Sequence, residues 1–190
     1  IFAIQVALAA VWESWGIKPE VVVGHSVGEI AAAYLSGALS WEDACCVAFH
    51  RGRTMDLATS HGAMVAAGIS AAEVEQWIEG QEDKVALAAI NGPSSVTISG
   101  DATAIEQLAA RLDEKGIFCR RLAVEYAFHS PQMEPVKDEL LDSLSHIRSR
   151  KPHTKLISTV TGQTIEEAEQ VNGEYWWQNV RQSVRFSDAM

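Results

Sequence analysis

The sequence lacks the features that mark two large classes of protein. It has no apolar run long enough to span a bilayer, and no basic segment precedes the apolar residues 1–12 as it would in a signal peptide. It also has no basic stripe, because 15 Lys and Arg face 25 Asp and Glu for a net charge of −10. We therefore expect neither a membrane protein nor a nucleic-acid-binding protein.

Cysteine is scarce and unpatterned. Cys45, Cys46 and Cys119 are odd in number, and their spacing fits no metal site. Reduced thiols, and with them a cytoplasmic location, are expected. The composition is otherwise that of an ordinary globular protein, with 47% hydrophobic and 21% charged residues.

The chain has no capping residue before its first helical pattern. Ile1, Ile4, Leu8, Val11 and Trp15 recur at helical spacing, but no Ser, Thr, Asp or Asn precedes them. The pattern predicts a buried helix in a fragment of a longer polypeptide, and residues 186–190 predict the opening of another helix.

Residues 20–36 organise the rest of the chain. A run of valines, predicted as a central parallel strand, leads into G-H-S-V-G and then into an alanine-rich stretch typical of helix. This is the pattern of a nucleophile elbow, in which a strained turn between strand and helix exposes a serine. Gly24 and Gly28 leave room where strand and helix cross. The free N–H groups at the start of the helix favour an oxyanion, so Ser26 is the predicted nucleophile.

The middle of the chain has a different pattern of predicted strands and helices. Strand patterns at residues 64–69, 85–90, 96–99 and 117–124 and helix patterns after Ser70 and Asp101 give the order β-α-β-β-α-β, which is the ferredoxin-like unit. The fold class predicted is therefore α/β, a hydrolase-like parallel-sheet domain with an inserted ferredoxin-like subdomain. Residues 1–61 and 125–190 form the core, which is incomplete, and residues 62–124 form the insertion.

The flanking core elements are less regular. A helix capped by Ser40 is expected to run to about Ala58, and a long helix to start at Ser130-Pro131. Residues 155–160 predict a strand, 161–173 a loop, and Tyr175 begins a short helix.

A nucleophilic serine needs a base within hydrogen-bonding distance, and the chain has six histidines. His129 ends the inserted unit and precedes a helix cap, a position where catalytic side chains are often placed. The side chain of His25 leaves the strand end in another direction than Ser26. The remaining four are expected to be solvated: His50, His61, His146 and His153.

Four segments carry a resemblance to a known family. They are G-H-S-V-G-E at 24–29, R-G-R at 51–53, N-G-P at 91–93 followed by S-G at 99–100, and Y-A-F-H-S at 126–130. Together they resemble the acyltransferase domain of polyketide synthases, a family that includes the malonyl transacylases of fatty acid synthesis. The resemblance covers nearly the whole chain in order, and the family's fold agrees with the one predicted above.

The resemblance implies roles for eight residues. Ser26 matches the nucleophile and His129 the base of a dyad, and the N–H of Val27 matches one oxyanion contact. The histidine would be oriented through main-chain carbonyl and amide contacts, and Asn179 stands where an amide side chain helps. The substrate-binding positions are Arg51, which would hold the free carboxylate of a dicarboxylic acyl group through its planar fork, and His25, Tyr126 and Phe128. The family's G-Q-G-x-Q loop, which gives a second oxyanion contact, would precede Ile1.

The resemblance also implies a reaction and its partners. An acyl group would pass from acyl-coenzyme A to Ser26 and then to the phosphopantetheine arm of an acyl carrier protein, beside a ketosynthase and other synthase domains. The transfer step needs no metal or other cofactor. Two alternatives stay open: a serine thioesterase or esterase, and a docking piece without activity.

The sequence motifs disagree about which extender unit the chain would select. In the family H-A-F-H accompanies malonyl selectivity and Y-A-S-H methylmalonyl selectivity, whereas this chain has Y-A-F-H. A phenyl ring at Phe128 occupies the space of an α-methyl group, and Val27 also resembles the malonyl type. The prediction is malonyl, with methylmalonyl as the alternative.

Overall fold

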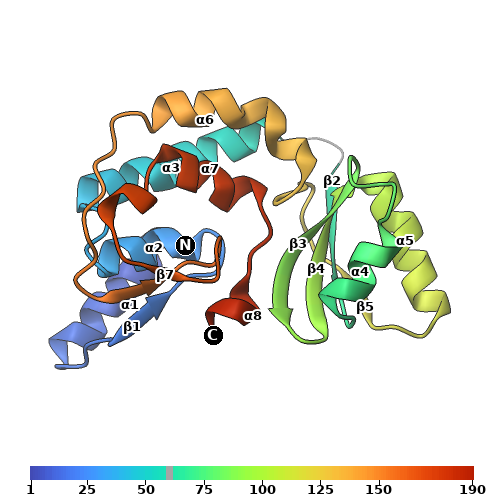
Figure 1. Ribbon diagram of the computed structural model, residues 1–190, viewed down its shortest axis with the longest axis horizontal. Coiled ribbons are helices and arrows are strands. Elements are labelled where there is room, and N and C mark those ends of the chain that lie inside the picture. Colours follow the sequence, from blue (N-terminus) through green and yellow to red (C-terminus); the bar gives the residue numbers. More distant parts are fainter. Residues whose placement is uncertain (59–61) are drawn as a thin grey trace.

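Two sheets of different kind divide the chain. The computed structural model describes residues 1–58 and 62–190 (Figure 1). A three-stranded sheet has the order β1-β6-β7, and a four-stranded sheet has the order β3-β4-β2-β5. The first lies on the left of Figure 1 among helices from both ends of the chain, and the second lies on the right. The predicted fold class, α/β with a hydrolase-like core and a ferredoxin-like unit, is confirmed.

The smaller sheet joins segments that are far apart in sequence. Strand β1 (Val21–Val23) pairs in parallel with β6 (Lys155–Ile157), which pairs antiparallel with β7 (Thr164–Ile165). Strand β1 was predicted to be central, but it lies at the edge of this sheet, and Val21 is 43% exposed. The predicted strand at 155–160 ends early: Thr159 hydrogen-bonds to Gly24 O in the elbow, and Ser158 hydrogen-bonds to Tyr175.

Helices accompany this sheet, and most of them form one hydrophobic core with it. They are α1 (Phe2–Ser14), α2 (Gly28–Leu35), α3 (Trp41–Leu57), the 3₁₀ helix η1 (Pro131–Val136), α6 (Lys137–Ser143), η2 (Ala168–Gln170), α7 (Gly173–Arg181) and α8 (Phe186–Ala189). The core includes Ile30, Val47, Met133, Leu140 and Trp176, none of them measurably exposed. Short η2 and β7 lie within residues 161–173, which were predicted to be loop.

The predicted long helix after Ser130 is instead two shorter ones. Pro135 has no N–H to donate to the carbonyl one α-helical turn earlier, so η1 forms first and α6 follows. The inward residues are nevertheless those predicted, since Val136, Leu140, Leu144 and Ile147 are all buried.

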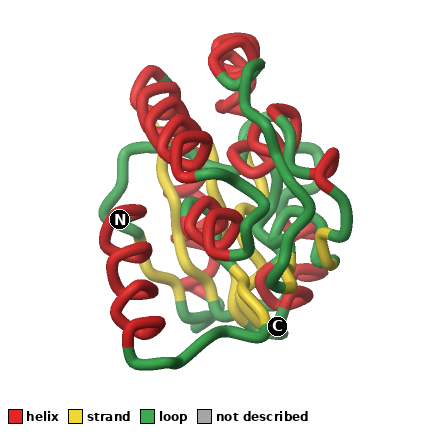
Figure 2. Tube along the Cα trace, turned by 90° about the vertical axis from the view of Figure 1, so that its left-hand side faces the viewer, coloured by secondary structure: helices red, strands yellow, loops and turns green. Residues whose placement is uncertain are grey.

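The helix at the start of the chain forms as predicted but is not buried. Its side bearing Phe2, which stacks on Trp41 at 5.7 Å, packs toward the neighbouring helices. The opposite apolar stripe is open, with Ile4 65% and Leu8 56% exposed. Figure 2 shows this helix on the outside of the molecule. Among the described residues no helix is both long and apolar enough to cross a membrane.

The second sheet is antiparallel throughout and carries two helices. Its elements are β2 (Gly62–Ala67), α4 (Ala71–Trp77), β3 (Val85–Gly92), β4 (Ser95–Asp101), α5 (Ala102–Glu114) and β5 (Cys119–Arg121). This is the predicted β-α-β-β-α-β order, with its own core around Ile98, Ile105 and Leu112. Strand β5 is shorter than the predicted 117–124.

The two parts meet beside the elbow. The backbone of Val184 donates to Ala88 O at 2.9 Å and accepts from Ile90 N at 2.8 Å, so the segment between α7 and α8 runs along β3. His25 Nε2 lies 2.8 Å from Asn91 Oδ1 at the end of the same strand. Residues of the core are thereby fixed against the inserted sheet.

Candidate active site

The turn after β1 has the geometry of a nucleophile elbow. Ser26 has a φ of 52°, in the left-handed region that side chains other than glycine rarely adopt. A Cβ on Gly24 would lie 2.3 Å from the backbone of Gly28, so the close strand–helix crossing requires glycine there. Gly28 is less constrained, because a Cβ would meet only the end of the Gln5 side chain, at 3.2 Å.

His129 is the other non-glycine residue with positive φ among the described residues, at 60°. Two strained residues that meet in space indicate a functional site rather than an accident of folding. Ser26 Oγ lies 2.9 Å from His129 Nε2, although the two residues are 103 positions apart.

The backbone after α7 fixes the imidazole of His129. Its Nδ1 lies 2.8 Å from the carbonyl oxygen of Gln182, and its backbone N–H donates to Val180 O at 3.1 Å. A carbonyl only accepts, so Nδ1 carries the proton and Nε2 presents a lone pair to Ser26. Burial and the nearby Arg51 charge lower the pKa of His129 to about 3, so the ring is a neutral acceptor at neutral pH.

Arg51 reaches the same serine from α3. Its Nη2 donates to Ser26 Oγ at 3.0 Å, and its Nε donates to Asn179 Oδ1 at 3.1 Å. The guanidinium is only 4% exposed. Burial lowers the pKa of Arg51 to about 10, and the charge of Glu29 opposes that shift. Arg51 therefore stays cationic at neutral pH beside the nucleophile.

Asn179 was predicted to orient the histidine, but its side chain bonds elsewhere. Its Oδ1 accepts from Arg51, and its Nδ2 donates to Glu29 Oε2 at 3.0 Å and to Ser26 O at 3.3 Å. The histidine is held by main-chain carbonyls one and three residues further along. The resemblance implied main-chain contacts to the histidine together with help from Asn179; in the structure the Gln182 carbonyl contacts the imidazole and the Asn179 side chain does not hydrogen-bond to it.

Val27 follows the nucleophile at the start of α2. Within residues 1–58 and 62–190, no hydrogen bond uses its backbone N–H. The N–H groups of Gly28 and Glu29, by contrast, already donate to His25 O and Ser26 O. A free donor next to Ser26 at a helix N-terminus is suited to binding an oxyanion.

The remaining predicted site residues surround this centre. The rings of Tyr126 and Phe128 stack with centroids 4.9 Å apart, and Phe128 packs against the main core. His25 turns away from Ser26 toward Asn91, with its ring 5.3 Å from that of Phe186. Of the histidines expected to be solvated, His146 and His153 are exposed and His50 is half-buried on α3, and His61 lies outside the described residues.

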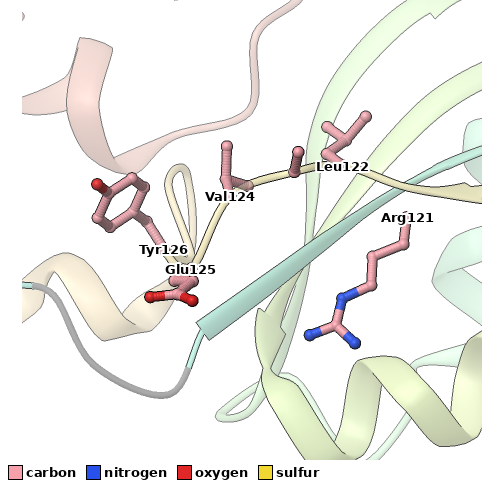
Figure 3. A pocket seen from close by; sticks show the side chains of 6 residues that line it. Arg121, Leu122, Val124, Glu125 and Tyr126 are labelled. Atoms are coloured by element: carbon pink, nitrogen blue, oxygen red, sulfur yellow. The ribbon is translucent and has the colours of Figure 1, made fainter.

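A hollow of about 620 Å³ adjoins the site through Tyr126. It is lined by Arg121, Leu122, Ala123, Val124, Glu125 and Tyr126. Figure 3 shows Arg121 and Tyr126 pointing away from opposite ends of this segment. None of Ser26, Arg51 and His129 lines it, so the hollow is not formed around these three side chains. Within the described residues no group of three or more His, Cys, Asp or Glu could hold a metal ion.

Comparison with known proteins identifies this arrangement. The family described as the acyl transferase domain matches residues 1–190. The chain belongs to this family. It is 45% identical over 191 residues to the spectinabilin polyketide synthase system protein NorA' of Streptomyces orinoci, covering 100% of this chain and 5% of that protein.

Solved acyltransferase domains have the same fold. The domain from module 8 of the salinomycin polyketide synthase is 40% identical with a TM-score of 0.96, covering 100% of this chain and 44% of that one. The acyl transferase domain of SpnD, in complex with 2-(pent-4-yn-1-yl)malonyl, is 30% identical with a TM-score of 0.89, covering 98% of this chain and 45% of that one. This chain thus spans less than half the length of these two acyltransferase chains.

Proposed function

We propose that the protein transfers an extender acyl group from coenzyme A to an acyl carrier protein through an acyl-serine intermediate. The observation that carries the proposal is a single oxygen, Ser26 Oγ, bonded both to a neutral histidine and to a buried arginine. The histidine supplies the base for nucleophilic attack. The arginine supplies a cation where the carboxylate of a dicarboxylic acyl group would lie.

In the first half-reaction His129 Nε2 takes the proton of Ser26 as Oγ attacks the thioester carbonyl. The oxyanion accepts a hydrogen bond from the N–H of Val27. When the tetrahedral intermediate collapses, the C–S bond breaks and His129 returns the proton to the sulfur of coenzyme A. The second half-reaction is the reverse with another thiol: His129 deprotonates the phosphopantetheine thiol, which attacks the acyl-serine, and Ser26 recovers its proton.

The proposal needs no metal, redox cofactor or catalytic carboxylate. The Nδ1 proton of His129 is held by a carbonyl, as expected of a dyad. The esterase or thioesterase alternative predicted from sequence has no support in the family match, and a buried arginine on the nucleophile favours an acyl group that carries its own negative charge. A carrier protein, a ketosynthase and other synthase domains are the proposed partners, and the cytoplasm the proposed location.

Arg51→Ala should impair transfer of dicarboxylic acyl groups and spare acetyl. Removing one side of a buried charge pair costs about 2–5 kcal/mol, which corresponds to a fall of roughly 30-fold or more in kcat/KM for malonyl-coenzyme A. Arg53→Ala is the matched control, since Arg53 lies on the same helix but is exposed and paired with Glu139. Equal losses for malonyl and acetyl would make Arg51 a structural residue instead.

We propose malonyl as the preferred extender unit over methylmalonyl. The phenyl ring of Phe128 lies directly before the catalytic histidine and is held against Tyr126, so an α-methyl group would compete with it for space.

Phe128→Ser should narrow this preference. A single methyl group changes binding by about 1–3 kcal/mol, or roughly 10–200-fold. Competition between malonyl- and methylmalonyl-coenzyme A measures the ratio, with Phe118→Ser, at an exposed position, as the control. A methylmalonyl preference in the unmodified protein would contradict the role of Phe128 and would indicate that Tyr126 determines the selectivity.

A further inference from the structure

Glu29 is a buried acid that the proposed reaction does not use. It lies in the first turn of α2, three residues after the nucleophile, and is fully buried. Burial raises its pKa, while hydrogen bonds from Thr159 and Tyr175 act in the opposite direction. Burying a carboxyl group costs free energy of desolvation, so its position three residues after Ser26 suggests a function.

Four groups hydrogen-bond to the carboxyl group of Glu29. The Thr159 N–H, the Thr159 hydroxyl, the Tyr175 hydroxyl and the Asn179 amide converge on its two oxygens. The Tyr175 hydroxyl is itself 2.8 Å from Ser158 Oγ, and the Thr159 hydroxyl is 2.9 Å from the carbonyl oxygen of Gly24. The Thr159 N–H and the Asn179 NH₂ can only donate, so Glu29 Oε1 and Oε2 each accept a hydrogen bond, and the carboxyl group is held between the end of β6 and α7.

Glu29 and the backbone of Ser26 together fix which way the amide of Asn179 faces. Glu29 Oε2 and Ser26 O are two acceptors on one side of the amide, so its NH₂ must point to them. The amide oxygen is then left for Arg51 Nε, at 3.1 Å. With the amide reversed, its NH₂ would meet the N–H of Arg51 and its oxygen would meet two acceptors, and neither contact is a hydrogen bond.

We propose that Glu29 is a positioning residue that acts through Asn179 to fix the plane of the Arg51 guanidinium, and so sets the preference for dicarboxylic acyl groups. A bidentate pair with a carboxylate depends on the orientation of that plane. The inference rests on the proposed function, since it concerns how Arg51 recognises the acyl group. Glu29 itself does not touch the acyl group in this account.

The isosteric change Glu29→Gln tests this positioning role. The glutamine amide must place its NH₂ at the position of either Oε1 or Oε2. Toward Oε1 it would face the backbone N–H of Thr159, which cannot rotate away. Toward Oε2 it faces the Thr159 hydroxyl, which can turn to Gly24 O, and the amide of Asn179, which can reverse. We expect the second arrangement, because the Thr159 hydroxyl and the Asn179 amide can both reorient whereas a backbone N–H cannot, and it removes the acceptor from Arg51 Nε.

Glu29→Gln in the full-length protein should therefore lower kcat/KM for malonyl-coenzyme A at least about tenfold, while that for acetyl-coenzyme A changes less than about threefold. Asn179→Ala removes the connection between Glu29 and Arg51 and leaves the other hydrogen bonds of Glu29 intact. It should give the same selective loss of malonyl transfer, so the test still works if one of the two variants fails to fold. Glu42→Gln is the matched control, an exposed acid in the first turn of α3.

Two further measurements separate positioning from a general structural role. In an Arg51→Ala background, Glu29→Gln should leave the malonyl-to-acetyl ratio unchanged, because nothing is left to position. The Arg51 Nε–H signal in a proton–nitrogen NMR spectrum should be present in the unmodified protein and lost in Glu29→Gln. A folded Glu29→Gln protein with equal losses for both esters, or with the Arg51 signal unchanged, would overturn the inference.

The signal also distinguishes this inference from the proposed function. If malonyl transfer is absent from the unmodified protein but the Nε–H signal still disappears in Glu29→Gln, the proposed function fails and the coupling of Glu29 to Arg51 stands. If transfer is normal and neither the ratio nor the signal changes, the positioning role fails alone.

Discussion

Ser26→Ala is expected to abolish the acyl-enzyme completely. The alanine keeps the elbow backbone but removes the oxygen that His129 and Arg51 both contact, and no other described hydroxyl group hydrogen-bonds to the ring of His129. Intact-mass spectrometry after incubation with malonyl-coenzyme A measures the product directly. The expected spectrum shows one acyl group on the unmodified protein and none on the variant.

Ser94→Ala serves as its control, since Ser94 is exposed in the turn between β3 and β4. That variant should be acylated at the normal rate. Normal acylation of the Ser26→Ala protein would disprove the assignment of the nucleophile.

His129→Ala should slow acyl-enzyme formation by about 10²–10⁴-fold, the usual contribution of a positioned general base. Its effect should not add to that of Ser26→Ala, because nucleophile and base act as a unit. Stopped-flow release of coenzyme A gives the rate of the first half-reaction. The unmodified protein should react at full rate well below pH 6.5, because the pKa of His129 is lowered to about 3 and the ring stays unprotonated.

His146→Ala is the comparison for this change, as His146 is exposed and distant in sequence from the elbow. If His129→Ala retained the normal rate of coenzyme A release while His146→Ala lost it, the base would have been assigned to the wrong histidine.

The sequence allowed most of the fold to be predicted, because the elements that matter have local signals. The valines before Gly24 and the alanines after Gly28 define β1 and α2, and the capping side chains of Ser40, Ser70 and Asp101 fix the starts of three helices. The predictions that were wrong concern features that depend on contacts between residues distant in sequence. Strand β1 lies at an edge, and α1 leaves its apolar stripe exposed, and neither fact is encoded in periodicity.

The residues of the candidate site could also be predicted in large part from the sequence. Ser26, His129 and Arg51 were identified from motifs, and the structure brings them together. A main-chain contact to the histidine was expected from the resemblance, but the residue that supplies it, Gln182, had no signal in the sequence, and Asn179 does not hydrogen-bond to the imidazole. Glu29 gave no signal beyond its place after the elbow, because its role depends on partners around residues 159, 175 and 179 that only the fold brings near.

The most direct test of the account follows one acyl group through both half-reactions on the full-length protein. The protein is incubated with malonyl-coenzyme A, freed of excess substrate, digested and mapped by mass spectrometry before and after addition of a carrier protein bearing phosphopantetheine. The account predicts a malonyl group on the peptide that contains Ser26, which disappears as the same group appears on the carrier arm. A malonyl group on any other residue, or one released as free acid and not transferred to the carrier, would contradict it.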